Sequence, residues 1–172
     1  MRRTSCHAKS IYVKDKNVIS CLSDSGTDYD ELIAREFPEQ CINFGISENN
    51  KVAAASGLAA CGKIPFASTF AVFAAGRAYD QIRNSICYPK LNVKICASHA
   101  GVSVGEDGAT HQMLEDIGMM RALPNMVVFS PSDDMQAHFL IEEAIRHEGP
   151  VYIRLTRPKV SEVYEKRKFE FS

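Results

Sequence analysis

The sequence lacks the features that mark several protein classes. No apolar run approaches the roughly 20 residues that a membrane-spanning helix needs. The basic pair Arg2-Arg3 is not followed by an apolar stretch, so the start does not resemble a secretory signal. The formal net charge is only −1, which argues against a nucleic-acid or membrane-surface footprint. We therefore expect a cytoplasmic protein with no nucleic-acid and no membrane partner.

Cysteine pairs with metal-binding or redox spacing are also absent. The chain has 6 cysteines, but none form a C-x-x-C pair and no histidine lies at zinc-finger spacing from a cysteine pair. Most lie in apolar segments, such as Cys96 in residues 93–97. We interpret them as reduced, buried side chains, and we expect no metal site in this chain.

Short apolar runs alternate with helical segments along the chain. A chain of 172 residues, 45% of them hydrophobic, is long enough for one globular domain, which we assign to residues 1–165. Residues 166–172, most of them charged, indicate a tail or the start of a linker. The predicted strands are 16–21, 64–68, 92–97, 126–130 and 151–155, and the predicted helices are 28–36, 47–60, 73–87 and 134–147. This order predicts an α/β fold, a three-layer αβα arrangement with a mainly parallel sheet covered on both faces. Such sheets bind ligands beyond the carboxyl ends of their strands, which here are the loops 45–48, 68–75 and 98–111.

The longest segment that a core does not explain is the connection over residues 98–112. It combines three glycines, two histidines and two carboxylates, and connections of this length are usually functional. It is neither a Walker loop nor a Rossmann fingerprint, because the Lys-Ser or Lys-Thr pair and the G-x-G-x-x-G spacing are missing. From residue types alone, a glycine-rich surface loop with incidental histidines remains an alternative.

Two other segments carry possible ligand-binding groups. Glu48 begins an alanine-rich helix, where the helix dipole favours a carboxylate, so helix stabilisation alone can explain it. Phe70 and Phe73 stand three residues apart, a spacing that ordinarily marks a helix face in the core. The small residues around them would let a flat ligand approach.

An ordered set of motifs covering about residues 17–158 resembles the transketolase family. The motifs are residues 45–48, 60–70, 77–83, 104–112, 120–126, 130–133 and 149–157. The resemblance implies the pyrimidine-binding domain of a thiamine-diphosphate enzyme, with the corresponding pyrimidine-type fold. It also implies a transferase of the pentose phosphate pathway, which moves a two-carbon ketol unit between phosphorylated sugars.

The resemblance assigns cofactor-binding roles to four residues. Glu48 matches the catalytic glutamate that hydrogen-bonds the aminopyrimidine ring nitrogen. Phe70 and Phe73 match the aromatic wall beside the pyrimidine. His111 matches a catalytic histidine close to the cofactor's amino group and the donor carbonyl.

Four more residues match substrate-binding positions. His99 matches a catalytic histidine near the sugar phosphate, and Arg157 an arginine that binds this phosphate. Asp107 matches the residue that reads a substrate hydroxyl, and Ser25 is a candidate phosphate contact.

The resemblance also implies partners. Full transketolases have a further domain that holds Mg and the diphosphate, and a mainly structural C-terminal domain that would follow the charged tail. We therefore expect a split or truncated form, an incomplete half-site that is inactive until it pairs as a homodimer or with a separate diphosphate-binding subunit. Two alternatives remain: a 1-deoxy-D-xylulose-5-phosphate synthase-like enzyme, and a non-catalytic interaction module derived from transketolase.

Overall fold

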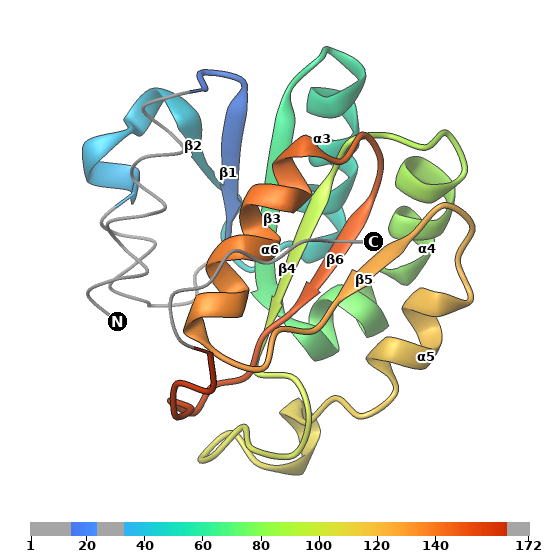
Figure 1. Ribbon diagram of the computed structural model, residues 1–172. Helices are drawn as coiled ribbons and strands as arrows, with labels where there is room; N and C mark the ends of the chain where they lie inside the picture. Colours follow the sequence, from blue (N-terminus) through green and yellow to red (C-terminus); the bar gives the residue numbers. More distant parts are fainter. Residues whose placement is uncertain (1–14, 24–32, 165–172) are drawn as a thin grey trace.

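The computed structural model describes residues 15–23 and 33–164, which build a six-stranded sheet (Figure 1). The strands are β1 (Val18–Leu22), β2 (Cys41–Asn43), β3 (Ile64–Phe70), β4 (Lys94–Ser98), β5 (Val127–Phe129) and β6 (Val151–Arg154). Their order is β2-β1-β3-β4-β6-β5, and every neighbouring pair is parallel. The predicted α/β fold with a parallel sheet is confirmed.

Helices cover both faces of this sheet. They are α3 (Glu48–Ala60), α4 (Tyr79–Gln81), α5 (Asp116–Arg121) and α6 (Asp134–Arg146), with the single 3₁₀ turns η1 (Pro38–Gln40) and η4 (Ala109–His111). Two further segments, η2 (Val72–Arg77) and η3 (Ile82–Cys87), are π-helical and flank α4. Among the described residues, no helix has both the length and the apolar character to cross a bilayer.

Alternation along the strands divides the core into two layers. Ile19, Ile95 and Tyr152 pack with α3, with the 72–87 segment and with α5 on one face. Val18 and Ile153 point to the other face and pack with α6. Because side chains alternate along a strand, the strands other than the edge strand β2 contribute to both layers, and the result is the expected αβα arrangement.

The structure corrects several details of the sequence-based prediction. The edge strand β2 was not predicted, since three residues are too short a run to show periodicity. The predicted helix 73–87 is wound mainly as π turns rather than as one α-helix. Most of the predicted helix 28–36 lies outside the described residues. Its last four residues, 33–36, are described and are helical.

The five described cysteines are free thiols. Burial raises the pKa of Cys21 to about 12 and that of Cys87 to about 11, as expected of inert core thiols. Cys61 differs from the expectation of burial: it follows the last residue of α3 and is exposed.

Candidate functional site

The acidic residue of the site is the first residue of α3. Glu48 is 4% exposed, so its carboxylate is almost completely withdrawn from solvent. The side chain of the N-cap residue Ser47 makes no capping hydrogen bond. Glu48 is an acidic side chain in the first turn of α3, where the helix dipole favours a negative charge. Its Oε2 accepts a hydrogen bond from Nη1 of Arg77 at 2.7 Å. The carboxylate is therefore paired, but by a side chain that is itself 48% exposed.

Two phenylalanine rings lie beside this ion pair. Phe70 is the last residue of β3 and Phe73 lies in η2, where the chain turns from strand to helix. Their rings are nearly parallel, with centroids 5.9 Å apart and 11° between the planes. The Arg77 guanidinium carbon lies 4.3 Å from the centroid of Phe73. This cation–π contact connects the aromatic pair to Glu48.

Both predicted histidines contact the same rings. The His99 imidazole stacks on Phe70 with centroids 3.9 Å apart and 16° between the planes. His111, at the end of η4, meets Phe70 and Phe73 edge-on at 6.2 and 5.4 Å. Edge and stacked contacts of this kind are the favoured geometries of aromatic groups. The structure thus gathers Glu48 and these four rings at one edge of the sheet.

The backbone and surroundings of His99 define its chemical state. It follows β4 directly and has φ of 59°, a left-handed conformation that a non-glycine residue adopts at a cost. Its Nδ1 lies 2.9 Å from the hydroxyl of Ser98. Burial lowers the pKa of His99, and the nearby Arg157 lowers it further, while Asp107 acts in the opposite direction. The imidazole is therefore neutral at pH 7.

Arg157 and Asp107 form a second group beyond His99. Nη1 of Arg157 lies 3.2 Å from Oδ2 of Asp107 and also donates to the carbonyl of Val104. Gly105 makes this approach possible: its φ is +87°, and a Cβ there would lie 3.0 Å from Nη1 of Arg157. The Arg157 and Asp107 side chains are 42% and 38% exposed, so both can still reach a ligand.

All of these groups lie at the carboxyl end of the sheet. Glu48 follows β2, Phe70 ends β3, His99 follows β4 and Arg157 follows β6. Parallel sheets bind ligands at this end, as expected from the sequence. Ser25, the remaining predicted contact, lies outside the described residues.

Sequence reasoning missed three residues that shape the site. Arg77 was noted within a motif but given no role, although its spacing of four residues from Phe73 is a possible signal of contact. Lys51 is fully buried, and its ammonium donates to the hydroxyl of Ser23 and the carbonyl of Ser68, which fastens α3 to the ends of β1 and β3. No pattern in the sequence indicates a buried lysine at this position.

The third missed residue is Asp116, at the start of α5. It is completely buried, and its Oδ2 accepts hydrogen bonds from Tyr152 Oη at 3.1 Å and Arg154 Nε at 2.9 Å. The Arg154 guanidinium also lies under Gly101, where a Cβ would come within 3.4 Å of it. Gly101 and Met113 form a bridge at the neck of the loop that carries His111. The Asp116 network therefore holds this loop against β6.

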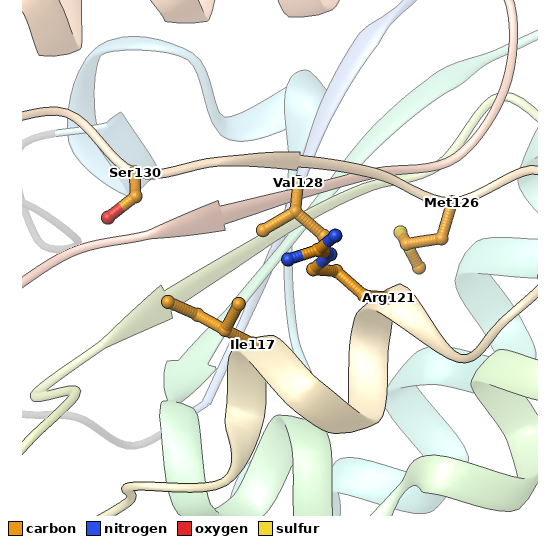
Figure 2. A pocket seen from close by; sticks show the side chains of 5 residues that line it. All are labelled: Ile117, Arg121, Met126, Val128 and Ser130. Carbon is orange, nitrogen blue, oxygen red and sulfur yellow. The ribbon is translucent and has the colours of Figure 1, made fainter.

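A cavity of about 500 Å³ lies apart from these groups (Figure 2). It is lined by Ile117, Arg121, Met126, Val128 and Ser130, between α5 and the edge strand β5. None of the predicted site residues that the structure describes lines it. The chemistry-bearing side chains and this cavity are therefore separate features of the molecule.

The side chains present fit the aminopyrimidine part of thiamine diphosphate. A flat heterocycle needs an aromatic face, a carboxylate that can hydrogen-bond a ring nitrogen, and exclusion of water, and Phe73 and the buried Glu48 offer these. Within residues 15–23 and 33–164, no group of three or more His, Cys, Asp or Glu side chains is arranged to hold a metal ion.

Comparison with known proteins gives consistent matches. Residues 8–162 match the family model described as the transketolase pyrimidine-binding domain. A putative transketolase C-terminal section of Methanocaldococcus jannaschii is 50% identical over 153 residues, which is 88% of this chain and 48% of that protein. A 6-deoxy-6-sulfo-D-fructose transketolase subunit of a Clostridium species is 41% identical over 124 residues, covering 72% of this chain and 38% of that protein.

A solved structure described as a split-gene transketolase, inactive beta4 tetramer, superposes with a TM-score of 0.83. It is 47% identical, and the match covers 97% of this chain and 54% of that one. The chain thus spans about half, or less, of the length of these relatives. Together with the parallel sheet and the side chains gathered at its carboxyl end, these matches show that the chain belongs to the transketolase family, as its pyrimidine-binding domain.

Proposed function

We propose that this chain forms the pyrimidine-binding half of a transketolase active site, which transfers a two-carbon ketol unit between phosphorylated sugars. The observation that carries the proposal is the buried Glu48 carboxylate, which the planar Arg77 guanidinium links to the Phe73 ring. An aminopyrimidine offers the same combination of flat surface and N–H groups. Because the matched relatives are named as transketolases, a deoxyxylulose phosphate synthase is less well supported.

Thiamine diphosphate, when bound, would supply the carbanion chemistry that the protein side chains lack. In this proposal Glu48 hydrogen-bonds the pyrimidine ring nitrogen, and Phe70 and Phe73 hold the ring by stacking and edge contacts. His111, whose ring meets both phenylalanines edge-on, holds or moves a proton beside the reacting carbonyl. The residues orient the ring and exclude water.

The substrate side of the proposal uses the group beyond His99. Arg157 binds the sugar phosphate as a charge-assisted fork, and Asp107 accepts from a substrate hydroxyl. His99, neutral at pH 7, donates or accepts a hydrogen bond there without adding charge. Ser25 stays a candidate phosphate contact.

The active form requires a partner that holds Mg and the diphosphate. We propose a homodimer or a separate diphosphate-binding subunit, in the cytoplasm, and little or no turnover by residues 1–172 alone. The split-gene relative and the relative named as a subunit support this arrangement, and the split-gene relative's beta4 tetramer is described as inactive. Residues 1–165 would form the single domain, with 166–172 as a tail or linker.

Reconstitution tests the proposed function. The chain is mixed with the diphosphate-binding domain of a transketolase, expressed as a separate polypeptide, together with Mg and thiamine diphosphate. Ketol transfer from a ketose phosphate to an aldose phosphate is then measured. We expect activity with the wild-type chain and a loss of at least about a hundredfold in kcat with Glu48→Gln, since an amide cannot share a proton with the pyrimidine ring nitrogen as a carboxyl group can.

Glu39→Gln is the matched control, because Glu39 is an exposed carboxylate in η1, before β2. It should leave the rate unchanged. A complex that assembles and binds cofactor yet shows no transfer would point to a non-catalytic interaction module. Full activity in Glu48→Gln would rule out the proposed role of this carboxylate.

A further inference from the structure

The Arg77 guanidinium makes two contacts at once. It donates to Glu48 Oε2 at 2.7 Å, and its central carbon lies 4.3 Å from the centroid of the Phe73 ring. A guanidinium is planar, carries several N–H donors and stacks on aromatic faces. A single flat, N–H-bearing group therefore bridges the carboxylate and one face of the ring.

These are the contacts that the proposed function gives to an aminopyrimidine. Two planar groups cannot lie on the same face of Phe73 and bind the same carboxylate oxygen at the same time. We propose that Arg77 is an internal stand-in for the cofactor's pyrimidine, a competitor that must leave Glu48 and Phe73 before the ring can bind. This inference rests on the proposed function, and it adds a specific competing residue.

Burial explains why the site holds such a group. Glu48 is 4% exposed, and an unpaired carboxylate at this depth carries a large desolvation cost. Arg77 compensates that charge in the unliganded chain. Its own side chain is 48% exposed, so it can return to water at little cost when the Glu48 carboxyl group instead shares a proton with the pyrimidine ring nitrogen.

The backbone of η2 places Arg77 for this role. The Ala78 N–H donates to the Phe73 carbonyl at 3.1 Å, a π-helical bond that spans five residues. Beside it, Gly76 has no atom of another described segment within 4 Å of the place where a Cβ would lie. The surface next to the Arg77 backbone is therefore open for a side chain that moves away.

Competition of this kind lowers the affinity for the ring, because only the fraction of molecules with Arg77 displaced can bind. The probe is 4-amino-5-hydroxymethyl-2-methylpyrimidine, which carries the aminopyrimidine alone and needs no Mg or diphosphate. Its binding to the full chain is measured by NMR titration for wild type, Arg77→Ala, Arg77→Lys and Glu48→Gln. The control is Arg83→Ala, since Arg83 is an exposed arginine in η3 whose side chain donates to its neighbour Asn84.

We expect Arg77→Ala to bind the probe roughly tenfold more tightly than wild type, which corresponds to about 1.4 kcal/mol of binding free energy. Arg77→Lys keeps the charge but loses the flat fork, so it should show a smaller gain and guards against a folding defect in Arg77→Ala. Arg83→Ala should match wild type. In wild type, the Arg77 side-chain resonances should lose the ring-current shift of Phe73 as the probe saturates.

Equal or weaker binding by both Arg77 variants, or no binding by either, would overturn the stand-in role. An Arg77 resonance that does not move while the Phe73 ring signals respond would overturn it too. The proposed function is judged separately by Glu48→Gln. If that variant binds the probe as well as wild type does, the carboxylate assignment fails, whatever Arg77 does.

Discussion

Lys94 is a fully buried cation at the start of β4. Its ammonium donates to the carbonyls of His147 and Gly149 at 2.7 and 2.8 Å, just after α6. Burial lowers the pKa of Lys94 to about 7, and the neighbouring Cys96 opposes this shift. In the unfolded chain the lysine has its ordinary pKa and keeps its proton to higher pH. Above pH 7 folding therefore releases this proton, so the free energy of unfolding rises with pH.

We predict that Lys94→Met removes this rise. Between pH 7.5 and 8.5, the wild-type free energy of unfolding should increase by up to about 1.4 kcal/mol per pH unit more than that of the variant. Urea melts at several pH values measure both slopes. The buried thiols Cys21 and Cys87, whose raised pKa values act in the opposite direction as the pH approaches 9, are present in both proteins, so their effect cancels in the comparison. Parallel slopes in the two proteins would contradict the lowered pKa.

Single residues show what sequence reasoning could reach. Glu48, Phe73 and His111 were singled out because each falls in a motif that resembles the transketolase family, and their roles stay predictions. Arg77 and Lys94 were not, because their roles depend on which backbone turns bring them against a buried acceptor. A cation inside the core has no periodic pattern that distinguishes it from a surface lysine.

The helix α6 depends on its N-cap residue, Asp133, for two connections. The Asp133 side chain accepts from the backbone N–H of Gln136, which caps the helix, and from the N–H groups of Val163 and Tyr164 near the end of the described chain. We predict that Asp133→Ala lowers the free energy of unfolding by about 1–2 kcal/mol, since both the cap and the anchor are lost.

Asp133→Asn is the matched comparison, because its amide oxygen can still cap the helix. It should lose clearly less stability than the alanine variant in the same thermal or urea melts. Faster proteolysis near residue 163 in Asp133→Ala alone would indicate that the anchor is released. Equal stability of all three proteins would show that the cap and anchor contribute nothing measurable.

At the scale of elements, the sequence predicted the longer segments and missed the finer ones. Strands β1, β3, β4, β5 and β6 and helices α3 and α6 were predicted within a few residues. Buried apolar runs mark the strands, and cap residues at the start and a glycine after the end mark the two helices. The strand β2 has only three residues, and the π turns in η2 and η3 need one extra residue per turn. Tertiary packing decides such features.

At the scale of the whole molecule, apolar side chains surround the candidate site. Ile46, Val102 and Leu114 are 75%, 65% and 62% exposed, on the loops at the carboxyl end of the sheet. Exposed apolar side chains gathered near a site are typical of a surface that another chain covers. We call these three residues the apolar rim, and we expect it to be part of the partner interface.

Lysine substitutions test the apolar rim. Ile46→Lys and Leu114→Lys should each weaken self-association, or binding to the diphosphate-binding subunit, by roughly tenfold, because a charge would be buried at the contact. Analytical ultracentrifugation measures the first equilibrium and a binding titration the second. Tyr88→Lys is the control: Tyr88 is 83% exposed, but it follows η3 and precedes β4, at the amino end of the sheet. Association that survives both rim substitutions and is lost in Tyr88→Lys would place the interface at the opposite end of the molecule, away from Glu48.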